Sequence, residues 1–164
     1  MKKLLVLLLI FSLTMSLVSC AIFPVYGSRK LISILKSHGY EILENIDSEV
    51  QDGMTGYIHA YNSDTKDEIY YMYFKNFNSA NSMYNYINNK QKSKISELKM
   101  KINKLENLLY KSEGISAAEK GDYYEQYILN KEALEEAENY ECGRGVNVVW
   151  YGTKKAVRDI RKGE

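Results

Sequence analysis

The sequence predicts an α+β fold with a single antiparallel sheet of about four to five strands, packed with helices that include one long helix. Three observations carry this prediction. Two strand-like segments flank a turn at residues 62–67, which is typical of a hairpin. Residues 90–110 contain no proline or glycine and repeat apolar residues every three or four positions, as a helix does. Shorter helix-like and strand-like segments surround both features, so we expect helices to cover one face of the sheet.

The first elements after residue 27 are predicted to be a helix and a strand. Ser28 is a suitable N-cap, and the helix should end at Gly39, because glycine readily adopts a positive φ. His38 then lies at a helix C-terminus, where a histidine is favourable without any ligand. Residues 40–46 alternate enough to form a strand.

The hairpin carries the first candidate binding residues. Within residues 54–61, Tyr57, His59 and Tyr61 fall on one side of the strand by their spacing of two. They could face a ligand, although cross-strand aromatic pairs also stabilise sheets that bind nothing. The second strand is predicted at residues 68–75.

The long helix is predicted at about residues 79–113, capped by Asn78 or Ser79, with a break near Asn89 as the alternative. Its exposed positions are rich in lysine. Its apolar positions form a narrow heptad stripe that we expect to pack against the rest of the chain. The stripe consists of Ile95, Leu98, Ile102, Leu105 and Leu109.

The C-terminal third is predicted to contain a linker at residues 114–121, a strand at 122–129 and a short acidic helix at 130–138. A flexible turn at 142–145, a strand at 146–151 and a helix at 154–162 follow. Thr153 should cap this last helix. Lys154 and Lys155 would lie in its first turn, where the helix dipole disfavours cations, so they are candidates for binding an anion.

The sequence excludes several kinds of chemistry. It contains no Walker loop, no dinucleotide-binding glycine pattern, no zinc-ligand spacing and no serine elbow, so we expect no cofactor or metal. Cys142 could be a nucleophile activated by Arg144, but a buried, inert thiol is the more ordinary interpretation. We therefore expect a protein that is not an enzyme.

The first twenty residues point to export. Lys2 and Lys3 precede an apolar run from Leu4, which is typical of a secretory signal peptide, whereas a membrane-spanning helix needs a longer run of about 20 apolar residues. The segment 17–20, Leu-Val-Ser-Cys, resembles the lipobox of bacterial lipoproteins. The resemblance implies that residues 1–19 are cleaved and that Cys20 carries the lipid.

This resemblance sets the expected organisation and location. Residues 20–27 would be a lipidated tether, and residues 28–164 a single domain on the extracytoplasmic face of the cell membrane. Of the 22 basic side chains, Lys2 and Lys3 lie in the leader, so 20 remain against 21 acidic ones. This balance argues against nucleic-acid binding, which usually requires a basic excess.

The expected function is that of a membrane-anchored, non-catalytic module that binds a ligand or partner in the bacterial cell envelope. Its partners would be membrane lipid through Cys20 and an envelope protein or an anionic polymer, and the chain is expected to be a monomer. One alternative is a protein-interaction module that acts through the helix at 90–111. The other is a small envelope enzyme that uses Cys142.

Overall fold

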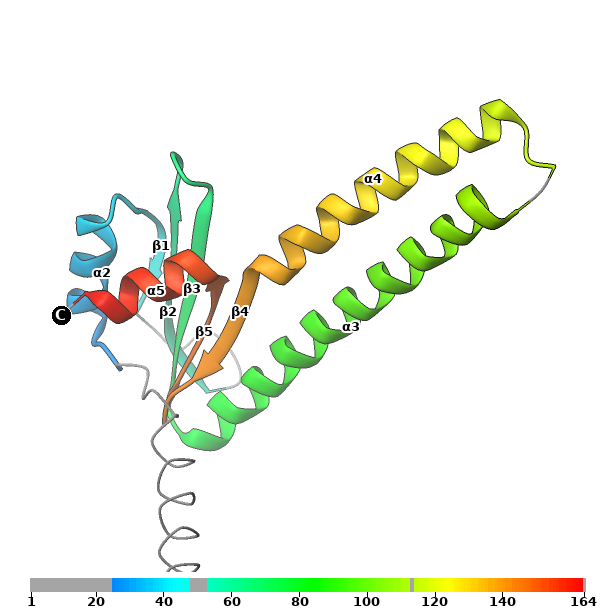
Figure 1. Cartoon of the computed structure of the whole chain (residues 1–164). Helices are drawn as coiled ribbons and strands as arrows, with labels where there is room; N and C mark the ends of the chain where they lie inside the picture. Colours follow the sequence, from blue (N-terminus) through cyan, green and yellow to red (C-terminus); the bar gives the residue numbers. More distant parts are fainter. Residues whose placement is uncertain (1–24, 48–52, 113, 164) are drawn as a thin grey trace, which may run out of the picture.

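A computed structural model describes residues 25–47, 53–112 and 114–163 of the chain. Its five strands form one antiparallel sheet in the order β1-β2-β3-β5-β4, and helices pack around it (Figure 1). This confirms the predicted α+β class. The strands are β1 (Glu41–Ile46), β2 (Met54–Asn62), β3 (Asp67–Phe74), β4 (Tyr140–Arg144) and β5 (Val148–Thr153). The predicted signal peptide and Cys20 lie outside the described residues.

Within this described part of the chain, four helices accompany the sheet: α2 (Ser28–Ser37), α3 (Phe77–Lys111), α4 (Ala117–Asn139) and α5 (Lys154–Lys162). The long helix α3 is continuous, so the alternative break near Asn89 is wrong. It begins slightly earlier than predicted, because Asn76 is the N-cap and its side chain accepts a hydrogen bond from the Ser79 amide at 3.0 Å.

Apolar side chains project from both faces of the sheet. On one face, alternate residues of the central strands, such as Ile58 and Tyr71, pack against α2 and α5 and form the main core. On the other face, Val149 and Phe74 pack against Ala80 in the first turns of α3. The expectation that helices cover one face is therefore wrong, because β5 is apolar on both of its sides.

Beyond the sheet, α3 and α4 run antiparallel and form a projecting helical hairpin, here called the arm (Figure 1). The heptad stripe faces α4, and its central residues Leu98, Ile102 and Leu105 are only 7–9% exposed. Tyr127 of α4 donates a hydrogen bond to Glu106 of α3 at 3.1 Å. The stripe therefore packs within its own chain, as predicted.

The predicted linker at 114–121 and strand at 122–129 are wrong, because α4 begins at Ala117. Ser116 and Glu119 form a capping box that starts the helix, with the Glu119 amide 3.3 Å from Ser116 Oγ. Tyr123 and Tyr127 are spaced by four and lie on one side of the helix. Their strand propensity suggested the wrong element, and packing against α3 overrides it.

The predicted turn at 142–145 is also wrong. Residues 140–144 form the edge strand β4, with Cys142 directly opposite Tyr151 of β5. The Trp150 side chain packs over Gly143, where a Cβ would lie 2.3 Å from the indole ring. The glycine is thus required by this close approach rather than by a turn. None of the helices among the described residues is long and apolar enough to cross a bilayer.

Candidate functional site

A cleft of about 490 Å³ opens between the sheet and the base of the arm. It lies on the sheet face opposite to α2 and α5, where α3 diverges from the strands. Its floor is formed by β3, β4 and β5, and its walls by α3 and the last turn of α4. The lining includes Glu68, Tyr70, Tyr140 and Tyr151 from the sheet, with Ile87, Gln91, Lys94 and Glu136 from the arm.

A row of stacked rings crosses four strands at the cleft. His59 of β2 stacks on Tyr70 of β3 with ring centroids 4.1 Å apart and an interplanar angle of 10°. Tyr70 is followed by Tyr151 of β5 at 6.4 Å, and Tyr151 by Tyr140 of β4 at 5.1 Å. Antiparallel register sets this order, because His59, Tyr70 and Tyr151 are directly opposite one another. The rings therefore present their edges and hydroxyl groups above the sheet.

Glu68 is the polar centre of this row. Its carboxylate accepts hydrogen bonds from the hydroxyl groups of Tyr140 and Tyr70, the latter at 3.4 Å. His59 Nε2 lies 3.3 Å from the same carboxylate, whose side chain is 24% exposed. Three side chains from β2, β3 and β4 therefore converge on one partly shielded negative charge.

The phenols of the cleft are held in their neutral form. Burial, followed by the hydrogen bond to Glu68, raises the pKa of Tyr140 well above its ordinary value. Burial and the charge of Glu68 likewise raise the pKa of Tyr70 and Tyr151. The hydroxyl groups therefore remain available as hydrogen-bond donors and acceptors over the whole physiological pH range.

Gln91 fixes the wall of the cleft. Its side-chain amide donates hydrogen bonds to the backbone carbonyl groups of Tyr140 and Ala137, at the junction of α4 and β4. This contact ties α3 to the point where the chain returns to the sheet. The cleft is consequently shaped by a hydrogen-bonded side chain rather than by a loose gap between elements.

The structure places the predicted residues Tyr57, His59 and Tyr61 on the same sheet face as the cleft. His59 belongs to the ring row, Tyr61 is opposite Glu68 in the register, and the Tyr57 hydroxyl donates a hydrogen bond to Glu44. Sequence reasoning missed Glu68, Tyr70, Tyr140 and Tyr151 as site residues. The spacing of two between Glu68 and Tyr70 was the available indication.

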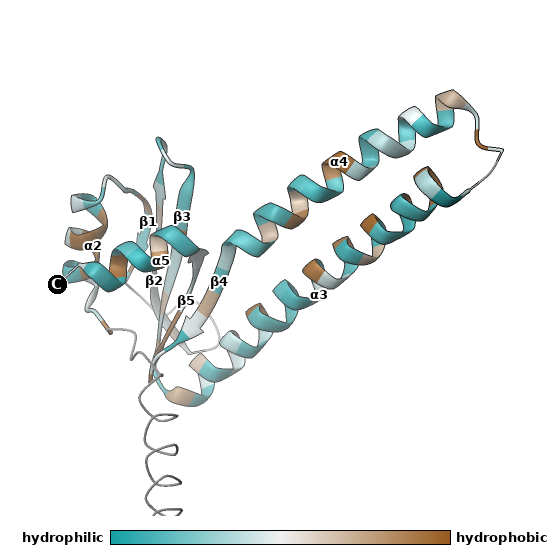
Figure 2. Ribbon diagram, viewed as in Figure 1, coloured by the Kyte–Doolittle hydropathy of each residue, from teal (hydrophilic) through white to brown (hydrophobic). Residues whose placement is uncertain are grey.

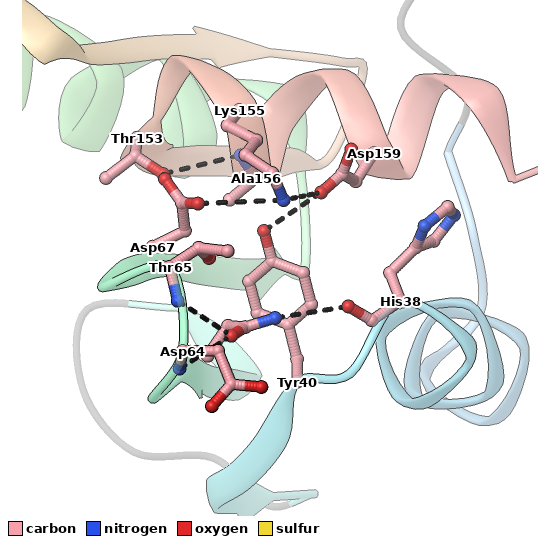
Figure 3. Close-up of polar contacts among 10 residues, drawn as sticks. His38, Tyr40, Asp64, Thr65, Asp67, Thr153, Lys155, Ala156 and Asp159 are labelled. Atoms are coloured by element: carbon pink, nitrogen blue, oxygen red, sulfur yellow. Dashed lines mark hydrogen bonds and ion pairs between the residues drawn. The ribbon is translucent and has the colours of Figure 1, made fainter.

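Lys154 and Lys155 do not belong to this cleft, because they lie on α5 at the opposite face of the sheet. Lys155 Nζ lies 2.9 Å from Asp159 and 3.6 Å from Asp67 (Figure 3). These acids, chiefly the hydrogen bond to Asp159, raise the pKa of Lys155. Lys155 therefore serves a polar network that holds α5, whereas Lys154 is exposed to solvent.

Cys142 lacks the surroundings of an activated nucleophile. Its sulfur lies 4.0 Å from Asn88 Oδ1, and burial raises the pKa of the thiol despite the nearby charge of Lys92. A raised pKa opposes formation of the reactive thiolate. Within residues 25–47, 53–112 and 114–163, no group of three or more histidine, cysteine or acidic side chains could hold a metal ion.

The fold and the cleft define a small α+β domain with a helical arm. Comparisons with protein-family models, with curated proteins and with solved structures found no match.

Proposed function

We propose that this protein is a lipid-anchored, non-catalytic binding module of the bacterial cell envelope, with its ligand bound in the cleft between the sheet and the arm. The cleft carries the proposal. Its volume of about 490 Å³ falls within the range of small-molecule sites, and its lining combines apolar side chains and aromatic rings with a few convergent polar groups. Tyr57, His59 and Tyr61 extend the same surface beyond the cleft.

The location rests on the lipobox-like segment that ends at Cys20. Two acyl chains on this residue would anchor the domain stably, whereas one chain binds a bilayer only marginally. Growth with a labelled fatty acid should label the wild-type protein. Cys20→Ala should remain unlabelled and unprocessed, and an unlabelled wild-type protein would refute the anchor.

Ligand binding can be tested by NMR on the full-length chain in detergent micelles, with tyrosine rings labelled with ¹³C. A panel of small polar compounds should shift the resonances of Tyr70, Tyr140 and Tyr151. Tyr110 and Tyr124 on the arm are exposed and serve as internal controls. Shifts confined to the arm, or no shifts with any compound, would argue against a cleft ligand.

A matched pair of variants sharpens the test. Tyr140→Phe removes a hydroxyl that bonds Glu68, and it should weaken binding of any compound found, because Glu68 is then less well oriented. Tyr124→Phe on the arm should leave that binding unchanged. Equal effects of both substitutions would contradict a specific role for the cleft.

A second candidate function is docking of an envelope protein through the arm. The predicted heptad stripe cannot be the docking surface, because α4 covers it. The observation that favours docking is the set of apolar side chains on the outer side of the arm, which include Met100, Tyr110 and Tyr124. An anionic polymer could bind a surface shared by the two basic helices α3 and α5. This has less support, since α5 and α3 pack on opposite faces of the sheet.

A further inference from the structure

The helix α4 carries apolar residues on more sides than α3 can cover. Tyr127 and Ala137 face α3, and Ala137 is buried there. Tyr124 and Leu129 nevertheless remain 55% and 57% exposed on other sides of the helix. A helix that is apolar on several sides is usually covered on more than one of them. Figure 2 shows hydrophobic positions at intervals along the otherwise mainly hydrophilic ribbon of α4.

The outer surface of the arm is also polarised by charge. Helix α3 carries seven lysines and two acids, whereas α4 carries seven acids and two lysines. Some of these charges pair within the chain, as Lys99 and Glu138 do at 2.8 Å. The remaining exposed charges leave one basic helix beside one acidic helix.

This charge pattern favours one kind of partner for the outer surface of the arm over others. A partner of uniform charge, such as an anionic bilayer or polymer, would attract one helix of the arm and repel the other. A second copy related by a two-fold axis presents an acidic helix to the basic helix and the reverse. Such an isologous contact satisfies both helices at once.

We propose that the outer surface of the arm is an interface between two copies of this chain, with α3 of one copy against α4 of its partner in a four-helix bundle. Ile128 and Tyr124 lie four residues apart on one side of α4 and would be buried in this contact. The 23 residues of α4 span about 35 Å. A face two helices wide then offers on the order of 700 Å² per copy, close to a standard interface.

This pairing is independent of any ligand in the cleft, and it differs from the monomer that the sequence predicts. The heptad stripe, on which the prediction of a monomer rests, is covered by α4. The proposed interface uses the apolar residues of the arm that the contact between α3 and α4 leaves exposed. Tethering of both copies to one membrane would raise their local concentration and favour the contact.

The test is a charge exchange in the full-length chain, measured by sedimentation in density-matched detergent. One variant combines Lys104→Glu with Lys111→Glu, which places two acidic side chains on α3 opposite the acidic α4 of the partner. A second combines Glu125→Lys with Glu132→Lys, which places two basic side chains on α4 opposite the basic α3 of the partner. All four side chains are exposed.

Each variant alone should self-associate at least about tenfold more weakly than the wild type, because like charges then face each other. An equimolar mixture should recover the dimer, since the glutamates introduced in α3 of one variant then face the lysines introduced in α4 of the other. The charge-conserving control, Lys104→Arg with Lys111→Arg, should pair like the wild type, and Ile128→Ser should weaken pairing. A wild type that stays monomeric at the highest attainable concentration, or a mixture that fails to recover the dimer, would overturn the proposal.

Discussion

The Thr153 hydroxyl donates a 2.7 Å hydrogen bond to Asp67 Oδ1, although the two residues lie 86 positions apart. Both side chains are buried. Thr153 Oγ1 also accepts a hydrogen bond from the Ala156 amide, so the same hydroxyl caps α5. The start of the hairpin's second strand and the start of the last helix are therefore joined at one point (Figure 3).

Asp67→Ala should lower the free energy of unfolding by about 1–3 kcal/mol, because it leaves the buried Thr153 hydroxyl without its acceptor. Asp67→Asn keeps an acceptor at this position and should cost less. The matched control is Asp64→Ala in the exposed turn, which should change stability by less than about 0.5 kcal/mol. Urea unfolding measures all three, and equal costs at positions 67 and 64 would contradict the network.

Two glycines should respond in opposite directions to alanine. A Cβ at Gly152 would lie 2.6 Å from the Glu68 carbonyl oxygen and 2.9 Å from Ile69 Cα, so Gly152→Ala must push β5 away from β3. We expect a loss of about 1–3 kcal/mol from this overpacking. A Cβ at Gly121 in α4 would meet nothing within 4 Å, so Gly121→Ala should stabilise the protein by about 0.5–1 kcal/mol. Denaturant midpoints with unchanged slopes would confirm both signs.

Elements with strong local patterns were predicted correctly from the sequence. The alternating pattern of residues 54–61 predicted β2, and Thr153 as an N-cap predicted the start of α5. The error at α4 arose because tyrosine favours strands, whereas the spacing of Tyr123, Tyr127 and Leu134 follows a helical stripe. That stripe gains stability only when α3 lies opposite, which is a tertiary effect.

The candidate site could be predicted only in part. The face that carries Tyr57 and His59 follows from a spacing of two. The position of Tyr140 beside Tyr151 does not, because it depends on β5 lying between β3 and β4. Nor does local sequence indicate that Lys155 has an acidic partner at Asp67, far away along the chain.

The arm should open locally without unfolding the sheet. Leu105→Ala removes a side chain that is buried only between two helices, so we expect the arm to lose about 2–3 kcal/mol of local stability. Hydrogen exchange should then accelerate in α3 and α4 beyond the sheet and remain unchanged in β2 and β3. Leu31→Ala in the main core should instead accelerate exchange in both the sheet and the arm. Met100→Ala on the exposed side of α3 should accelerate exchange in neither.

Alkaline pH should destabilise the protein through its buried tyrosines. Burial raises the pKa of Tyr71 from 10.0 to about 12, although the Tyr26 amide that donates to its oxygen acts in the opposite direction. The folded state therefore holds the phenolic proton more tightly than the unfolded state does. This contribution is fully present below pH 10 and is lost as the pH rises through about 12.

For Tyr71 alone the contribution is on the order of 2–3 kcal/mol. The free energy of unfolding, measured from neutral pH to pH 12, should fall as the pH rises. Tyr71→Phe should reduce the slope of this fall by the equivalent of about one proton, since phenylalanine does not ionise. Phenolate absorbance should likewise show Tyr71 ionising only when the protein unfolds. Ionisation of Tyr71 in a folded protein near pH 10 would show that the tyrosine is not shielded by the core.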